Sequence, residues 1–226
     1  MTSAEQQLLA ILHTKGGLDE VKRRLLLDAY IEAASPPKMS LDEYLDWLDE
    51  DTFAEWVNGR IIVMSPASRQ HQIIVDFLVA ILRPYSEKND LGEAISAPFP
   101  MKLNQSGREP DLLFVLKKNL KRMKPTFLDG PADLVVEVIS EESIGRDRGD
   151  KYYEYEKAGI SEYWLIDPLR DQVEFYQLDA RGRFQLIRPD EAGLYYSKIV
   201  AGLALPVNWL FSPPPVLEAL RSLGII

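Results

Sequence analysis

The chain has no cysteine and only two histidines, His13 and His71. The missing cysteines exclude disulfides, a thiol nucleophile, iron–sulfur clusters and zinc sites built on thiolates. Two histidines are also too few for a multi-histidine metal site. Cysteine-based catalysis and a thiolate zinc site are therefore not expected.

Long apolar runs are missing as well. No stretch approaches the roughly 20 residues needed to cross a bilayer. The first residues carry neither the basic segment nor the small-residue cleavage site of a signal peptide. Hydrophobic residues make up 46% of the 226 positions and charged residues 27%, which are ordinary globular values. We expect a soluble, cytoplasmic protein with one main domain and no membrane partner.

Positive charge is scarce, because 26 Lys and Arg stand against 35 Asp and Glu, a net charge of −9. This balance argues against a broad, non-specific grip on nucleic acid, which normally needs a basic face. The charge is uneven, since residues 40–53 carry six acids and no cation, whereas residues 117–124 carry five cations. The basic segment could contact phosphates and position a duplex, or it could be a solvated loop between strands.

Helical spacing of apolar residues, or a helix-start signal, marks four segments: residues 1–34, a short segment from residue 40, residues 68–83 and residues 146–158. Pro84 is expected to end the third helix, because proline lacks the N–H that a helix interior needs. Gly159 suits the C-terminal end of the fourth.

Strand patterns alternate with these helices. Asn58 and Gly59 between two apolar runs predict a hairpin with a type I′ turn. Further strands are expected at residues 93–103, 110–115, 133–140, 161–167, 172–178 and 183–188, with a last strand and a short helix after residue 202. The order predicts an α/β or α+β fold, a mixed β-sheet flanked by helices, over residues 40–226. Residues 1–39 are expected to form an N-terminal helical extension.

Two carboxylates lie in apolar strands. Asp111 opens the strand at 110–115, and Glu137 interrupts the β-branched run at 133–140. A buried carboxylate must shift its pKa or find a partner. Asp111 could cap a turn at the strand start, and Glu137 could pair with an Arg or Lys in the core. A divalent cation would satisfy both at once, since Mg²⁺ is held by one or two carboxylates plus waters and phosphate.

Asp147, Lys151 and Tyr155 are spaced i, i+4 and i+8 in the helix after the Glu137 strand, so they share one face. Lys151 could reach over the strand end toward a scissile phosphate, where it would stabilise developing negative charge. It could instead form a surface ion pair with Asp147, which would contribute only about 0.3–0.5 kcal/mol.

A longer pattern joins these residues. Pro110-Asp111 is followed by Asp133-Leu-Val-Val-Glu137-Val-Ile-Ser140, then by Asp147, Lys151, Tyr155 and Gly159 at four-residue spacing, then by Glu162-Tyr-Trp-Leu-Ile-Asp167-Pro168. With Glu55, Asn58-Gly59-Arg60 and His71 upstream, the pattern resembles the Uma2 family, a group of restriction-endonuclease-like proteins abundant in cyanobacteria, within the PD-(D/E)XK nuclease superfamily. The resemblance covers about residues 40–200.

The resemblance implies a restriction-endonuclease-like core in which Asp111 and Glu137 hold Mg²⁺ or Mn²⁺. Ile139 stands where the superfamily has its catalytic lysine, and Lys151 from the following helix is the expected replacement. Superfamily members often add an early acidic residue to the metal site, here Glu55 in the first hairpin. His71, near the start of a helix, could bind phosphate or carry a proton, or it could be an exposed residue with no role.

We therefore expect a metal-dependent endonuclease that hydrolyses phosphodiester bonds in DNA, preferably a duplex, with Lys151 assisting Asp111 and Glu137. A homodimer is expected by analogy, because cutting both strands of a duplex commonly uses two sites. The main alternative is a catalytically impaired nuclease fold that acts as a binding or scaffold module, which the missing strand lysine and the acidic charge favour. A nuclease acting on RNA or branched DNA is a third possibility.

Overall fold

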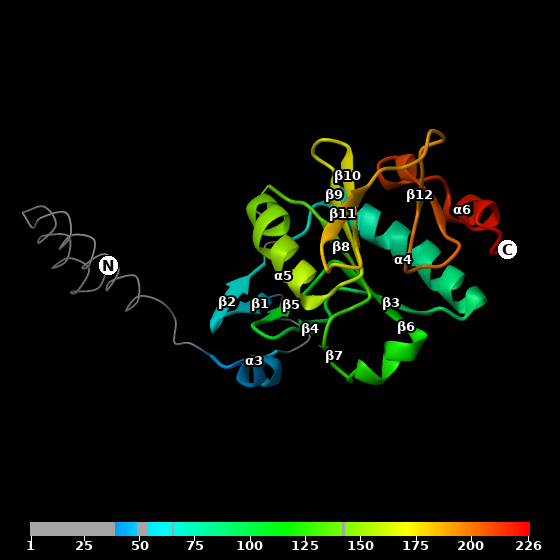
Figure 1. Ribbon diagram of the computed structural model, residues 1–226. Helices are drawn as coiled ribbons and strands as arrows, with labels where there is room; N and C mark the ends of the chain where they lie inside the picture. Colours follow the sequence, from blue (N-terminus) through cyan, green and yellow to red (C-terminus); the bar gives the residue numbers. More distant parts are fainter. Residues whose placement is uncertain (1–38, 49–53, 65, 142) are drawn as a thin grey trace, which may run out of the picture. The chain divides into compact units, whose positions relative to one another are not determined.

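The computed structural model describes residues 39–226, apart from 49–53, 65 and 142. The helix predicted over residues 1–34 lies outside the described residues, and the domain division predicted after residue 39 stays a prediction. The unit described below comprises Leu41–Ile226 (Figure 1). None of the helices in the described part of the chain combines the length and the apolar character that crossing a bilayer requires.

A six-stranded mixed sheet forms the centre of this unit, in the order β11-β10-β9-β8-β6-β3. Its strands are β3 (Gly92–Ser96), β6 (Leu112–Leu116), β8 (Leu134–Val138), β9 (Glu162–Asp167), β10 (Gln172–Leu178) and β11 (Phe184–Ile187). Strands β8 and β9 are parallel, and the other neighbours are antiparallel. The predicted mixed sheet with flanking helices is confirmed.

Alternating residues of the central strands face two different apolar cores. Leu134, Val136 and Val138 of β8 pack with α4 (Arg69–Asn89) and α6 (Val216–Ser222) on one face. Val135 and Ile139 pack with α5 (Lys151–Ala158) on the other. Figure 1 shows α4 and α5 on opposite sides of the sheet. Glu137 alternates in the same way, so it points into the layer that contains α5.

A smaller five-stranded sheet, in the order β2-β1-β5-β4-β7, completes the layer on the α5 side. Its strands are β1 (Ala54–Val57), β2 (Arg60–Val63), β4 (Met101–Lys102), β5 (Ser106–Arg108) and β7 (Leu128–Asp129). The predicted hairpin is confirmed, because Asn58 and Gly59 have φ values of 51° and 89°, which a type I′ turn requires.

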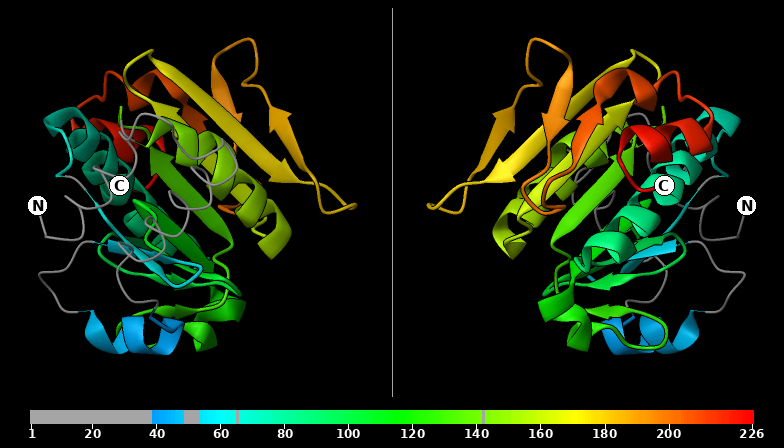
Figure 2. Two further views of the ribbon diagram at one scale, coloured as in Figure 1. Left: turned by 90° about the vertical axis from the view of Figure 1, so that its left-hand side faces the viewer. Right: turned by 90° about the vertical axis from the view of Figure 1, so that its right-hand side faces the viewer.

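Helix α3 (Leu41–Trp47) packs against this smaller sheet (Figure 2). The buried Tyr44 donates a hydrogen bond from its hydroxyl to the carbonyl of Ala54, at 2.5 Å. A Cβ atom at Gly107 would lie 2.7 Å from the Tyr44 ring. Glycine is therefore needed at this position of β5 for α3 to approach the strand.

Helix α4 does not end at Pro84, and that prediction was wrong. The helix continues to Asn89, with Pro84 in its interior. The turn after Pro84 is stabilised by packing, since Tyr85 and Ser86 are buried and the Ser86 hydroxyl donates to the Gly92 carbonyl at 2.6 Å. Tertiary contacts here outweigh the backbone hydrogen bond that proline removes.

The remaining elements are short. They are the strands β12 (Leu194–Tyr196) and β13 (Ala204–Pro206) and the helical turns η1 (Lys117–Arg122), η2 (Arg146–Asp150) and η3 (Val207–Leu210). Strand β12 was not predicted, and neither were β5 and β7 of the smaller sheet. The helix expected over residues 146–158 is present, but its first turn, η2, is a π-helix, and the helix is capped by Gly159 in the left-handed conformation.

The C-terminal segment is attached to the central sheet through a buried carboxylate, Glu162, at the start of β9. Its side chain accepts hydrogen bonds from five donors: Trp164 Nε1, Tyr195 Oη, Ser197 Oγ and the backbone N–H groups of Lys198 and Ile199. The charge of Glu162 is thus satisfied by neutral donors. This carboxylate has a structural role.

Candidate active site

Asp111 and Glu137 lie at the same end of two neighbouring strands. Leu112 of β6 pairs with Val136 of β8 in the antiparallel register. Asp111 directly precedes Leu112 and Glu137 directly follows Val136, so the two carboxylates lie opposite each other on neighbouring strands. The backbone N–H of Val138 donates to Asp111 Oδ2 at 2.6 Å. The expected placement of two carboxylates on adjacent strands, near one end, is confirmed.

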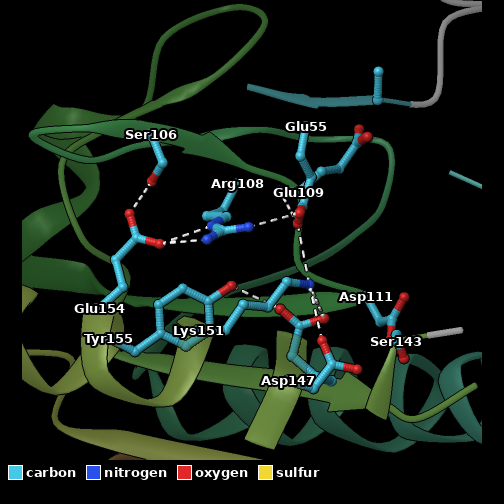
Figure 3. Close-up of polar contacts among 12 residues, drawn as sticks. Glu55, Ser106, Arg108, Glu109, Asp111, Ser143, Asp147, Lys151, Glu154 and Tyr155 are labelled. Carbon is cyan, nitrogen blue, oxygen red and sulfur yellow. Dashed lines mark hydrogen bonds and ion pairs between the residues drawn. The ribbon is translucent and has the colours of Figure 1, made fainter. Parts of the chain in front are cut away.

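Lys151, the first residue of α5, points at this pair of strands. Its Nζ atom lies 2.9 Å from Glu137 Oε2, 3.1 Å from Glu55 Oε1 and 3.3 Å from Asp147 Oδ1 (Figure 3). Lys151 and Asp147 are each only 1% exposed, so the alternative of a surface ion pair between them is wrong. The alternative in which Glu137 pairs with a lysine is correct, and the lysine is the one expected to take a catalytic part.

The π-turn η2 and helix α5 hold the other side of Glu137. Tyr155, one turn beyond Lys151, donates its hydroxyl to Glu137 Oε1 at 2.7 Å (Figure 3). Asp147, Lys151 and Tyr155 therefore all approach the strand end, as their spacing predicted. π-Helical turns inside helices are frequent at functional sites.

A second group of charges lies next to Lys151, in which Glu55 was predicted and Arg108 and Glu154 were not. Arg108 of β5 contacts Glu55 Oε2 through Nη1 at 3.0 Å and Glu154 Oε2 through Nη2 at 2.7 Å. Glu154 also accepts a hydrogen bond from the Ser106 hydroxyl. Glu55 is fully buried and is shared between Arg108 and Lys151. It thus links the smaller sheet to α5.

The ionisation of this cluster follows from burial and from an excess of acids. Burial by itself would lower the pKa of Lys151, but Glu137, Glu55, Asp147 and Asp111 outweigh it and raise the pKa well above its ordinary value. Burial likewise opposes ionisation of Glu55, but Lys151 and Arg108 leave its pKa lowered. Burial, together with Asp147, Asp111 and Glu55, raises the pKa of Glu137 well above its ordinary value in spite of Lys151. Lys151 is therefore charged, and burial among other acids disfavours ionisation of Glu137.

Glu109 is a further buried acid beside this cluster. Burial, then the charge of Glu55, raises its pKa to about 8. Its Oε2 atom is buried and has no hydrogen-bond partner, and the backbone N–H of Glu109 donates to Glu55 Oε1 at 3.3 Å. Carboxyl groups thus outnumber cations in this region of the protein.

His71 reaches the site from α4. Ser68 caps that helix by accepting a hydrogen bond from the His71 backbone N–H. The imidazole Nε2 lies 3.0 Å from Asp111 Oδ2, and its side chain is only 13% exposed. His71 is therefore not the exposed residue of the alternative prediction, and its role stays a prediction. The Nδ1 atom is buried without a hydrogen-bond partner.

These side chains open into a cleft of about 620 Å³. Its lining comes from the segment after β2, the first turns of α4, the segment after β3 and the connection from β8 to α5. Of the predicted site residues, it includes His71, Asp111, Glu137 and Lys151. Glu55 is not among the lining residues, and it reaches the site only through its ion pair with Lys151.

The donor set fits a hard divalent cation held by few protein ligands. Within the described ranges, no three carboxylate or histidine side chains are grouped so that one ion could contact them all. Mg²⁺ commonly uses only one or two carboxylates and keeps its remaining ligands as water or phosphate. Asp111 and Glu137 are the two carboxylates at this strand end that could supply such a pair, and the excess of buried acids favours added positive charge at this place.

The basic segment at 117–124 lies away from the cleft. It forms η1, directly after the end of β6 that is opposite Asp111, at roughly 20 Å along an extended strand. Lys117 pairs with Asp90, and Arg122 lies 3.6 Å from Asp133. A direct contact between this segment and a phosphate bound in the cleft is thus not supported.

The sequence and the fold were compared with those of known proteins. The family model Uma2, described as "Putative restriction endonuclease", matches residues 41–208, which include every residue of the site. Among solved structures, that of a putative nuclease belonging to DUF820 from Anabaena variabilis is similar, with a TM-score of 0.66 and 20% sequence identity over 77% of this chain and 98% of that chain. At this identity, the likeness shows the fold alone. No curated protein matches the chain.

Proposed function

The chain belongs to the Uma2 family, and from this premise we propose that it is a metal-dependent endonuclease that hydrolyses phosphodiester bonds in DNA. The observation that carries the proposal is the position of Lys151. The strand that bears Glu137 has Ile139 where a catalytic lysine is expected, and Lys151 brings its ammonium group to 2.9 Å from Glu137 from the next helix.

Asp111 and Glu137 are the proposed ligands of the ion. Both line the cleft, and Asp111 Oδ1 has no protein partner in the described part of the chain. A divalent cation held there would activate water and neutralise charge on the scissile phosphate. Tyr155 orients the Glu137 carboxylate through its hydrogen bond to Oε1.

Lys151 is the proposed electrostatic catalyst. Glu55 and Asp147 keep the ammonium group charged and directed at the strand end. A fixed cation next to a phosphate stabilises negative charge that develops during the displacement, and it does so most effectively where water is excluded. Arg108 supports this arrangement because it shares Glu55.

His71 is the proposed proton-transfer group. The Asp111 carboxylate lies 3.0 Å from Nε2 and fixes the orientation of the ring. Since His71 comes from α4 whereas Lys151 comes from α5, the two groups approach the cleft from opposite faces of the central sheet.

The alternative function, a binding or scaffold module without catalysis, rests on the three carboxylates that already occupy Lys151. If these ion pairs persist in the presence of substrate, the ammonium group is not available to the phosphate. Cleavage assays separate the two functions.

The proposal is tested with circular single-stranded DNA and supercoiled plasmid, because only an endonuclease cuts a substrate without ends. Wild type is incubated with Mg²⁺, with Mn²⁺ and with chelator, and is compared with Glu137→Gln. We expect cleavage only with metal and a loss of at least about 100-fold in the variant. Glu191→Gln, which removes one exposed carboxylate outside the cleft, is the matched control and should cleave normally. Absence of cleavage with either ion, or equal cleavage by Glu137→Gln, would leave the scaffold function.

A further inference from the structure

We propose that the cleft receives a single unpaired nucleotide, with its base against the apolar lining and its phosphate on Arg146, so that the preferred substrate is unpaired DNA rather than intact duplex. This inference rests on the proposed nuclease function of the same site. It names the form of DNA that the cleft can accept.

The first argument is depth. Glu137 is 3% exposed, and Lys151 and Asp147 are each 1% exposed, so the groups proposed for catalysis lie at the bottom of the cleft. The volume of about 620 Å³ falls within the roughly 300–1,000 Å³ of pockets that enclose small molecules. A phosphate within a duplex carries the neighbouring base pairs with it, whereas a nucleotide that has left the stack can enter such a pocket alone.

The second argument is the composition of the lining. Apolar side chains come from the segment after β2, from α4, from the segment after β3 and from the end of β8, among them Met64, Val75, Pro98 and Val138. Polar and charged groups come from residues 140–151, from the start of α4 and from the strand ends at Asp111 and Glu137. A nucleotide has the same two parts, a flat apolar base and a charged phosphate. The base of a duplex nucleotide is covered by its stacking neighbours and could not use the apolar lining.

The third argument is Arg146, on the π-turn η2. It lines the cleft, its Nε atom is buried without a hydrogen-bond partner, and no carboxylate pairs with it in the described part of the chain. Arg148, two residues later, is instead held by Asp167 and Glu174. A guanidinium at the wall of a cleft, with no carboxylate partner among the described residues, suits a phosphate, which it can bind through two parallel hydrogen bonds.

The fourth argument is charge. Among the described residues that line the cleft, the carboxylates are Asp76, Asp111, Glu137, Glu141 and Asp147, and the cations are Arg146 and Lys151. A duplex carries one negative charge per about 1.7 Å of its axis, and many of these would face acidic walls. An unpaired nucleotide brings one or two phosphates to the two cations. The charges of the cleft are therefore suited to one or two nucleotides of an unpaired DNA strand.

The experiment compares three fluorescent oligonucleotides that share one sequence: a single strand, a blunt duplex and a duplex with an unpaired flap. Binding to wild type is measured by anisotropy with Ca²⁺, and cleavage is measured with Mg²⁺. We expect the single strand and the flap to bind at least about tenfold more tightly than the blunt duplex, because the duplex must unstack a base at a cost of a few kcal/mol. Cleavage is expected within the unpaired parts.

The contribution of Arg146 is tested with Arg146→Ala and Arg146→Lys. Loss of the guanidinium should weaken binding of the single strand by about 10- to 100-fold, the usual effect of a hydrogen bond to a charged group, and lysine should restore part of it. Arg181→Ala, in the exposed turn between β10 and β11, removes the same charge outside the cleft. It should bind within about twofold of wild type.

The outcomes separate this inference from the proposed function. Equal or tighter binding of the blunt duplex, or equal effects of Arg146→Ala and Arg181→Ala, would overturn the inference. Preferential cleavage of the blunt duplex would overturn it too, while the nuclease function would stand. Preferential binding of the single strand without cleavage of any substrate would support the inference and overturn the nuclease function.

Discussion

Lys151 is the residue on which the charge balance of the site depends. Its ammonium group is the shared partner of Glu55, Glu137 and Asp147, all of them buried. Removing one member of a buried ion pair leaves the other charges without compensation, which commonly costs about 3–5 kcal/mol. The same side chain is therefore important for stability and for the proposed chemistry.

Lys151→Met should lower the free energy of unfolding by about 3–5 kcal/mol at pH 7.5. The loss should be smaller at pH 5 and below, because the carboxylates that lose their partner then protonate more readily. Urea denaturation at both pH values measures this effect. Lys157→Met, at an exposed position of the same helix, is the control. A loss that is equal for the two variants, or independent of pH, would contradict a buried cluster held by Lys151.

Glu137→Gln tests the metal site without a catalytic assay. At Mg²⁺ about a hundredfold above Kd, binding should stabilise the wild type by about 2.7 kcal/mol, or roughly 5–10 °C in Tm. The amide removes the negative charge, so the rise in Tm should fall to about 1 °C or less, measured by calorimetry with and without Mg²⁺. An undiminished rise in the variant would mean that the ion binds elsewhere.

The buried Glu109 side chain should make the stability of the fold depend on pH. Its pKa is raised from 4.5 to about 8 by burial and by Glu55, so the folded state prefers the protonated form. The stability that the protonated Glu109 carboxyl contributes to the folded state is fully present below about pH 4.5, and it is lost as the pH rises through about 8. Between pH 4.5 and 8.5, Glu109→Gln should therefore gain about 3–5 kcal/mol of stability relative to wild type.

Denaturation of wild type and Glu109→Gln at a series of pH values checks this expectation. The two stability curves should converge at low pH and separate toward pH 8.5. Glu191→Gln, at an exposed position, should give a curve parallel to that of the wild type. Parallel curves for Glu109→Gln as well would show that Glu109 titrates normally in the folded protein.

At the scale of elements, helix α4 shows how packing overrides a local signal. Pro84 lies inside the helix, and the turns beyond it are held by Tyr85, Ser86 and the cap at Asp90. Pro84→Ala would restore a backbone N–H and remove a steric conflict within the helix. It would also increase the conformational entropy of the unfolded chain, by about 0.4–1 kcal/mol.

The net effect of Pro84→Ala should be a stabilisation of about 1–2 kcal/mol. Cleavage should be unchanged, because Pro84 is outside the cleft. Thermal denaturation and the plasmid assay measure the two quantities. A destabilised variant would mean that the proline ring itself contributes packing that alanine cannot replace.

Strands β8 and β9 each contain a buried glutamate in an apolar run, Glu137 and Glu162, and their sequences do not separate the two roles. Glu162 is satisfied by five neutral donors and lies outside the cleft. Glu137 is bound by Lys151 and Tyr155 and lines the cleft. The difference arises from the elements that pack over each strand end, so only the tertiary structure distinguishes a structural acid from a candidate metal ligand.

At the scale of the whole molecule, the net charge of −9 and the distant position of the basic segment restrict how nucleic acid can bind. If only one or two phosphates contact cations in the cleft, log K for a single strand should fall with log salt at a slope of about −0.7 to −1.4. Anisotropy titrations at several salt concentrations measure this slope. A slope of about −5 or steeper would indicate an extended basic track and would contradict the single-nucleotide cleft.

Local patterns in the chain were sufficient to predict much of this protein. The alternation of apolar residues predicted the central strands, Asn58 and Gly59 predicted the first hairpin, and the four-residue spacing from Asp147 placed Lys151 and Tyr155 on one side of their helix. These features depend on interactions between residues close in sequence, or on the two-residue and 3.6-residue periods of strands and helices. The carboxylates Asp111 and Glu137 were found because a charge in an apolar strand is conspicuous.

Only the tertiary structure decided which groups meet. Glu55 contacts Lys151 across 96 positions of sequence, Arg108 bridges Glu55 and Glu154, and His71 meets Asp111 from the other side of the sheet. The continuation of α4 past Pro84 and the pKa of Glu109 are decided in the same way. No local pattern encodes these contacts, because they arise when two sheets and two helices pack together and exclude water. Burial then determines how strongly each charge acts on the next.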